Sequence, residues 1–235
     1  MAARDDLPLG RKAYGKIPHL PGSRTGRADR TAPPGVVERC TVRAREGEEV
    51  IVQEKLDGSC AAVARVGGEL LALGRYGTLA AQSNNEPPRR FAAWVDEHRA
   101  RLEPLVGEGE WVVGEWVAIA HGTRYRLSHP PFVPFDLFSS GNQASLDVLL
   151  ARLATLGGWL TPPRLLSRGA AMGVEQAVSL LGPSGGHGAI DPPEGAVWRV
   201  ERKGRVVAMA KFVRGGKVNG AFLPENTGQG LVWNV

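Results

Sequence analysis

The chain has 235 residues, 43% of them hydrophobic and 23% charged, with a formal net charge of +5. Its 31 glycines and 17 prolines indicate short elements joined by tight turns, which excludes a coiled-coil protein, and its apolar fraction excludes a disordered one. No run approaches the roughly 18–20 apolar residues of a membrane-spanning helix, and charges occupy the N-terminus where a signal peptide has its apolar core. We therefore expect a soluble, cytoplasmic protein with no membrane contact.

The first 48 residues show little periodicity and predict a basic arm that packs on the main body, residues 49–235. Residues 50–55 then predict a strand. Residues 61–66 and 69–73 flank Gly67-Gly68 and predict a hairpin. Residues 88–105 carry apolar side chains at near-helical spacing after a proline, and predict an amphipathic helix.

The second half of the chain predicts four more strands and two more helices. The strands are 111–118, 132–138, 195–201 and 205–213. The helices are 145–156, with Ser145 as N-cap, and 172–181. Together the elements predict an α+β protein built mainly from hairpins, without internal repeats.

Positive charge is concentrated in two segments. Residues 1–30 contain seven basic and three acidic side chains, and residues 199–217 contain seven basic and one acidic. Clustered positive charge is typical of proteins that bind a polyanion such as nucleic acid, and a solvated surface is the alternative. Cys40 and Cys60 form neither a disulfide framework nor a zinc pattern, so we interpret both as small buried hydrophobic residues.

Charged residues also stand in or beside the apolar strands. They are Glu54, Lys55, Asp57, Arg75, Glu115, Asp136, Glu194, Arg199, Lys211 and Arg214. A carboxylate in an apolar strand is costly to bury unless it is paired or functional. Each position alone is also explained as an edge-strand charge or an ion-pair partner. As a set, the cations suit a polyphosphate, and the carboxylates suit a hydrated metal ion and a ribose.

In their order along the chain these residues resemble the covalent nucleotidyltransferases, which comprise ATP-dependent RNA and DNA ligases and mRNA capping enzymes. The motifs are Lys55-Leu56-Asp57-Gly58, Glu115, Phe135-Asp136, the run from Glu194 to Arg199, and Lys211. Two further stretches resemble the RNA ligase branch, in its double-strand form: residues 17–23 and residues 114–129. The resemblance covers roughly residues 14–214, and the ordered set is far more specific than Lys-x-Asp-Gly alone. It implies an antiparallel-sheet nucleotidyltransferase domain with a nucleotide cleft between its sheets.

The resemblance also implies roles for these residues. Lys55, Asp57 and Lys211 would be catalytic, with Lys55 attacking the α-phosphorus of ATP. Because a lysine near its ordinary pKa of about 10.4 is protonated at pH 7, nearby cations must lower that pKa. The implied nucleotide-binding residues are Glu54, Lys55, Arg75, Glu115, Phe135, Val197, Arg199 and Lys211. The implied ligands of Mg²⁺ or Mn²⁺ are Asp57, Glu115, Asp136 and Glu194.

Individual contacts follow from the same resemblance. Glu115 would accept hydrogen bonds from the ribose, Phe135 and Val197 would enclose the adenine, and Glu54 would help to select it. Arg75 would contact the phosphates or the nucleic-acid end, and Arg199 would hold the phosphates of ATP or AMP.

Three positions depart from the family pattern. Arg199 stands where the family usually has lysine, and Cys60 stands where RNA ligases commonly have asparagine. Met209 replaces the first of two final lysines, so that Lys211 alone remains. Because few residues follow Lys211, we expect no C-terminal OB-type domain. The basic arm or a partner protein would then take over substrate docking.

The sequence therefore predicts a monomeric ATP-dependent RNA ligase, acting in RNA repair. It would form a lysyl-AMP intermediate at Lys55, transfer the AMP to a 5′-phosphate RNA end and seal that end to a 3′-hydroxyl, including ends in a nicked duplex. An ATP-dependent DNA ligase or a capping-type guanylyltransferase is the alternative within this class of enzyme. The stretch from His121 to His129 favours the RNA ligase. A non-catalytic RNA-binding module with a ligase-like fold is the alternative outside it.

Overall fold

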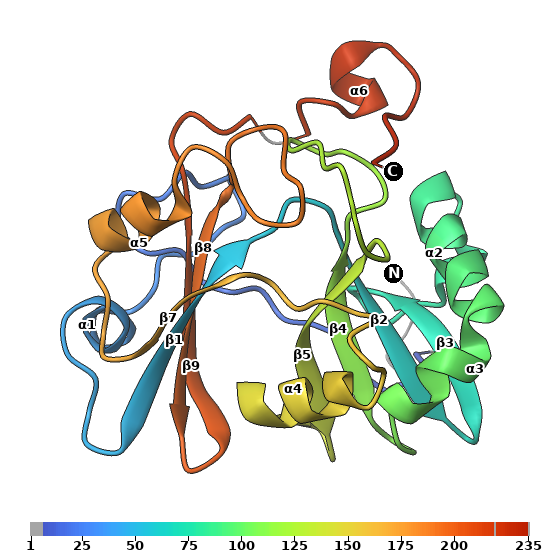
Figure 1. Ribbon diagram of the computed structural model, residues 1–235, viewed down its shortest axis with the longest axis horizontal. Coiled ribbons are helices and arrows are strands. Elements are labelled where there is room, and N and C mark those ends of the chain that lie inside the picture. Colours follow the sequence, from blue (N-terminus) through green and yellow to red (C-terminus); the bar gives the residue numbers. More distant parts are fainter. Residues whose placement is uncertain (1–6, 219, 235) are drawn as a thin grey trace. The chain divides into compact units, whose positions relative to one another are not determined.

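The computed structural model describes residues 7–218 and 220–234 (Figure 1). The chain forms two compact units, each assembled from separate segments. The first unit comprises Met1–Gly15, Ser59–Trp116 and Phe132–Pro162, and the second comprises Lys16–Gly58, Val117–Pro131 and Pro163–Val235. The expected arm over residues 1–48 is thus divided between them, and Arg4 of that arm lies outside the described residues. The functional domain expected over residues 49–235 stays a prediction.

The second unit is built on a four-stranded antiparallel sheet with the order β7-β1-β8-β9. The strands are β7 (Leu165–Gly169), β1 (Glu48–Lys55), β8 (Gly195–Arg202) and β9 (Arg205–Val213). β1 and β8 pair along their whole length, with Glu48 opposite Arg202 and Lys55 opposite Gly195. The start of β1 and the β8–β9 turn therefore lie at one end of the sheet, and Lys55 lies at the other (Figure 1).

Two helices, α1 (Pro34–Thr41) and α5 (Val174–Leu181), cover one face of this sheet (Figure 1). Alternate strand residues such as Val50 and Trp198 pack with Cys40 of α1 and Leu181 of α5 in one apolar cluster. The short helix α6 (Pro224–Thr227) follows near the end of the chain. The opposite face of the sheet carries Lys55 and its neighbours.

The first unit contains a five-stranded antiparallel sheet with the order β3-β2-β4-β5-β6. Its strands are β3 (Glu69–Gly74), β2 (Ser59–Val66), β4 (Trp111–Trp116), β5 (Phe132–Ser139) and β6 (Asn142–Gln143). Its helices are α2 (Glu86–Glu97), α3 (Arg99–Leu102) and α4 (Leu146–Ala154), with 3₁₀ turns η2 at Ala80–Gln82 and η3 at Glu103–Leu105. Phe91 of α2 packs on Trp116 and Phe132, which fixes α2 on one face of the sheet.

The predicted α+β class with antiparallel sheets is confirmed, and every predicted strand is present with ends shifted by at most two residues. The single helix expected over residues 88–105 is wrong. It divides into α2, α3 and η3, because His98 leaves the helical conformation (φ −104°, ψ 16°) and Pro104 lacks the N–H that a continuing helix needs. No helix of the described residues is long and apolar enough to cross a membrane.

Candidate active site

Lys55, at the end of β1, forms an ion pair with Glu194. Its Nζ donates a hydrogen bond to Glu194 Oε2 at 2.5 Å and another to the carbonyl oxygen of Leu56 at 3.1 Å. The strand register explains the pair, because Lys55 stands opposite Gly195 and Glu194 immediately precedes that glycine. The Lys55 side chain is 20% exposed. The fold thus brings together two motif residues far apart in the chain and leaves the Lys55 side chain partly exposed.

Gly195 allows β9 to approach β8 beside this pair. A Cβ at Gly195 would lie 1.8 Å from the carbonyl oxygen of Phe212, although such atoms are essentially never closer than 3.0 Å. Arg214 follows β9 directly, and its N–H donates to the carbonyl oxygen of Glu194, the residue before Gly195, at 3.0 Å. The glycine of the Glu-Gly motif is therefore required where the two strands meet.

The loop after β1 is held by the segment from His121 to Tyr125. The N–H of Asp57 donates to the hydroxyl of Tyr125 at 3.1 Å, and Asp57 Oδ2 accepts the N–H of Gly122 at 3.0 Å. Lys217 Nζ lies 3.4 Å from the same carboxylate oxygen. The sequence places Lys217 in the basic segment 199–217 but does not predict its contact with Asp57, because it lies beyond the last motif in a glycine-containing segment without periodicity.

Val197, Arg199 and Lys211 lie on the same face of the sheet as Lys55. Lys211 stands opposite Val197, and Val197 stands opposite Gln53, two residues before Lys55. Directly opposed residues, and residues two apart along a strand, point to the same side of a sheet. The structure therefore gathers these predicted residues on the face opposite α1 and α5.

Arg199 and Lys211 differ in their surroundings. Arg199 is only 3% exposed, and its Nη1 lies 3.6 Å from Glu201 Oε1. Lys211 is half-buried, and its backbone pairs with an earlier segment: its N–H donates to Pro18 at 2.9 Å, and its carbonyl oxygen accepts the N–H of Leu20 at 2.8 Å. The stretch over residues 17–23 therefore runs along β9 beside Lys211.

Glu54 points to the other face of the sheet. Its carboxylate accepts the N–H of Gly186 at 2.7 Å and lies 3.3 Å from Arg164 Nε, and the residue is only 2% exposed. Burial raises the pKa of Glu54, and the Gly186 N–H and Arg164 oppose that rise. The structure thus separates Glu54 from the Lys55 amine and ties it to the glycine-rich loop around Gly186.

In the first unit, a β-bulge brings Phe135 and Asp136 to the face that carries Glu115. Val113 stands opposite Asp136, whereas the next residue of β4 stands opposite Pro134, so Phe135 is the extra residue. A bulge re-aims side chains that strict alternation would send to opposite faces. An aromatic ring and two carboxylates thereby share one side of this sheet.

Tyr14 joins the residues of this face. Its hydroxyl donates to Asp136 Oδ2 at 2.5 Å, and its ring packs edge-on against Phe135 with centroids 5.2 Å apart. Its N–H donates to the carbonyl oxygen of Arg75 at 3.1 Å, and Arg75 Nη2 donates to Gly15 at 2.6 Å. No pattern in the sequence points to Tyr14, which lies in the non-periodic lead-in.

Burial is the main cause of the pKa shifts of Glu194, His121 and His19 in the second unit. It raises the pKa of Glu194, with Lys55 opposing the rise and Asp57 adding to it. It lowers the pKa of His121, and it lowers that of His19, where Lys211 adds to the effect. The two histidines are therefore held toward the neutral form beside the charged groups.

Carboxylates are the candidate metal ligands. Among the described residues, no three His, Cys, Asp or Glu side chains lie close enough together to hold a metal ion by themselves. Mg²⁺ commonly binds through only one or two carboxylates plus the phosphates of a substrate. Asp57 and Glu194 are the candidate carboxylates near Lys55 in the second unit, and Glu115 and Asp136 are the candidate carboxylates on one face of the first unit's sheet.

The RNA ligase family model matches residues 48–213 of this chain. That segment runs from the start of β1 to the end of β9 and contains all the predicted site residues. The search of curated proteins finds no match.

Solved structures of Naegleria gruberi RNA ligase have a similar fold. A mutant with ATP and Mn is 15% identical with a TM-score of 0.56, covering 93% of this chain and 64% of its own. A mutant with AMP and Mn is 16% identical with a TM-score of 0.53, covering 83% and 59%. The enzyme with pyrophosphate is 16% identical with a TM-score of 0.54, covering 90% and 62%. The chain thus spans less than two thirds of the length of these structures.

Proposed function

Because the chain belongs to the RNA ligase family, we propose that it is an ATP-dependent RNA ligase that carries AMP on Lys55. The observation that carries this proposal is the environment of the Lys55 amine. It belongs to a partly exposed side chain at the end of a buried strand, pairs with Glu194 at 2.5 Å, and shares a face with Lys211. A lysine that served packing alone would require neither an ion pair with Glu194 nor a second lysine on the same face of the sheet.

In the first step the nitrogen of Lys55 attacks the α-phosphorus of ATP. The new P–N bond forms as the bond to the β-phosphate oxygen breaks, and pyrophosphate leaves. Lys55 must be neutral to attack, and its ion pair with Glu194 favours the ammonium form. Nucleotide binding must therefore separate the two groups. Lys211 then supplies positive charge toward the α-phosphate, where negative charge develops.

A divalent ion fits this site. Asp57 and Glu194, with Glu115 and Asp136, would hold Mg²⁺ or Mn²⁺ in part through its waters. Bound there, the ion would offset phosphate charge and help to keep the lysine unprotonated. The Naegleria enzyme structures with ATP or AMP and Mn support this choice of nucleotide and ion.

The remaining residues would bind the nucleotide. Phe135 would stack on the adenine with Val197, and Glu115 would accept hydrogen bonds from the ribose hydroxyls. Arg75 and Arg199 would contact phosphates. Glu54 would contribute to adenine selection through the loop that it anchors at Gly186, because its own carboxylate is buried on the opposite face of β1.

Two further transfers would complete the reaction. The oxygen of a 5′-phosphate RNA end attacks the phosphorus of lysyl-AMP, which frees Lys55 and leaves the AMP on that end. A 3′-hydroxyl then attacks the activated 5′-phosphate, forming a phosphodiester bond and releasing AMP. The ends to be joined would include those of a nicked duplex. RNA repair by a cytoplasmic monomer, aided by the basic arm or a partner protein, is part of the same proposal.

Incubation with α-labelled ATP and Mg²⁺ tests the first step. We expect acid-labile label on the wild type and on Lys12→Ala, a matched change at an exposed lysine of the first unit, and none on Lys55→Ala. A chelator should abolish the labelling. Absence of label from the wild type, or equal labelling of Lys55→Ala, would show that the proposal is wrong.

Parallel incubations separate the alternatives. Labelling by GTP instead of ATP would indicate a capping-type enzyme. Joining of a nicked DNA duplex in preference to the matching RNA duplex would indicate a DNA ligase. RNA binding without label from any nucleotide would indicate a non-catalytic module.

A further inference from the structure

Basic side chains gather at the end of the second unit's sheet that lies away from Lys55. Here the turn after α1, the start of β1 and the β8–β9 turn meet, with Glu48 opposite Arg202. A Cβ at Gly47 would lie 3.8 Å from Arg202 Nε, which places the two turns in contact. We call this group the basic end; its members are Arg39, Arg43, Arg45, Arg168, Arg202, Lys203 and Arg205.

Acidic neighbours neutralise only part of this charge. Glu48 pairs with Arg39 at 2.6 Å and Glu49 with Arg168 at 2.8 Å. Glu38 lies in α1, Glu46 lies in the turn before β1 and Glu201 lies opposite Glu49, so seven basic side chains stand against five acidic ones. Five of the basic residues are exposed and form no ion pair within the part of the chain that the structure describes. They are Arg43, Arg45, Arg202, Lys203 and Arg205.

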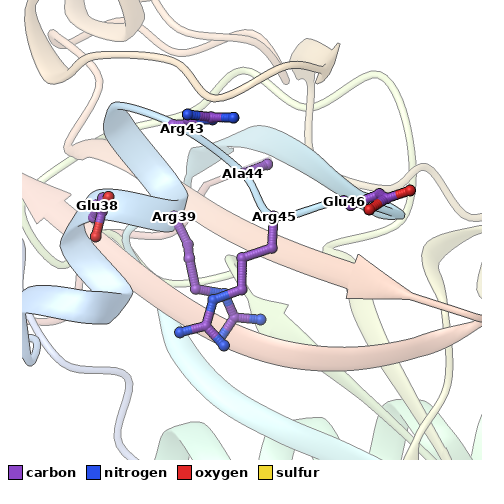
Figure 2. A pocket seen from close by; sticks show the side chains of 6 residues that line it. All are labelled: Glu38, Arg39, Arg43, Ala44, Arg45 and Glu46. Atoms are coloured by element: carbon purple, nitrogen blue, oxygen red, sulfur yellow. The ribbon is translucent and has the colours of Figure 1, made fainter.

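The three arginines after and within α1 line a pocket of about 340 Å³, together with Ala44 and the two glutamates Glu38 and Glu46. Figure 2 shows Arg39 and Arg45 directed to one side of the turn and Arg43 to the other. An arginine fork matches the oxygens of a phosphate, and cations on both sides of a turn suit a chain of phosphates better than one small anion. Like charges repel, and although Arg39 is already paired with Glu48, a further anionic partner would reduce the repulsion among the exposed arginines.

The basic end is too far from Lys55 to contact the bound nucleotide. β1 runs seven residue steps from Glu48 to Lys55, which at about 3.3 Å per residue is about 23 Å. Double-stranded DNA advances about 3.4 Å per base pair, and the more compact A-form helix of RNA advances less, so this separation corresponds to about seven or more nucleotides. Anything that spans both ends of β1 must therefore be a long polyanion.

We propose that the basic end binds backbone phosphates of the RNA substrate about seven or more nucleotides from the end that is joined. The inference rests on the proposed function and adds a second, distant contact to it. It requires no base recognition, because phosphate contacts position a nucleic acid without reading its sequence.

Binding of nicked RNA duplexes by the full chain tests this inference. The duplexes have arms of either 5 or 15 nucleotides on each side of the nick, and the variant is Arg43→Ala combined with Arg45→Ala. Two lost phosphate contacts should weaken binding of the long duplex roughly 25- to 60-fold at 0.1 M salt and reduce the salt slope by about 1.4–1.8. Binding of the short duplex should not change. Arg99→Ala is the control, because Asp96 already pairs with that arginine at 2.8 Å.

A second variant guards against misfolding of the first. Lys203→Asn removes one charge at a position with φ of +50°, a conformation that asparagine tolerates, and should have about half the effect on the salt slope. All variants should label Lys55 with AMP as the wild type does, because ATP does not reach the basic end. Wild-type affinity and salt slope in both variants, or equal weakening for short and long duplexes, would overturn the inference. Failure of the wild type to label would count against the proposed function alone, since RNA binding is measured separately.

Discussion

Replacing Gly195 with alanine adds one methyl group where β9 approaches β8 beside the Lys55–Glu194 pair. The added Cβ would start 1.8 Å from the carbonyl oxygen of Phe212 and must reach at least 3.0 Å, so about 1.2 Å of movement is needed. Both atoms belong to paired strands, and the strands themselves must move. Overpacking of this kind typically costs about 1–3 kcal/mol of stability.

The same movement should act on catalysis. A displacement of about 1 Å at a catalytic group can lower a rate about 100-fold, and Glu194 is the residue next to Gly195. We therefore expect lysine labelling in Gly195→Ala to fall about 100-fold at a temperature where the variant remains folded by circular dichroism. Gly173→Ala is the matched control, because a Cβ there meets nothing within 4 Å. Labelling of Gly195→Ala within threefold of the control would refute the reasoning.

Two further predictions concern buried polar groups. Tyr14→Phe should lower the free energy of unfolding by about 1.5–3 kcal/mol, because Asp136 loses a hydrogen-bond donor at 2.5 Å; an unchanged urea midpoint would contradict it. Burial, with His129 adding to it, lowers the pKa of His187 from 6.5 to about 4. The unfolded chain therefore binds the proton first, and up to about 2 kcal/mol of stability should be lost as pH falls from 6.5 to 5. His187→Asn, which accepts the local φ of +58°, should reduce this loss of stability, measured as the free energy of unfolding in urea at pH 6.5 and at pH 5. A variant that loses as much stability as the wild type would contradict the assignment.

The hairpins were predictable from the sequence because their signals are local. Gly67-Gly68 has positive φ at both residues, as its two-residue turn requires, and the flanking strands pair in the expected register. α1 was missed because Pro33-Pro34 suggests a loop, although a proline is also favourable at the first position of a helix. β7 was missed because it is short and is stabilised by pairing with β1, more than 100 residues earlier in the chain.

The site was predictable as an ordered set of residue types but not as a geometry. The pairing of Lys55 with Glu194 depends on strand register, and the common face of Glu115, Phe135 and Asp136 depends on a bulge. Neither feature leaves a pattern in a single sequence. Successive side chains of a strand point to opposite faces of the sheet, so Glu54 and Lys55 must lie on opposite faces of β1. The sequence does not say which of these two faces is buried under the helices, and the structure shows that it is the face of Glu54.

The discontinuous build of the second unit has a consequence for synthesis of the chain. β1 completes its sheet only by pairing with β8, about 140 residues later, whereas β2 to β5 of the first unit pair with neighbours closer in sequence. At about 5–20 residues per second, a ribosome takes roughly 7–28 s to make that intervening stretch. Throughout this interval the Lys55 strand has no β8 to pair with, while the first unit can already fold. We expect the first unit to assemble early and Lys55 to be positioned last, when β8 and β9 arrive.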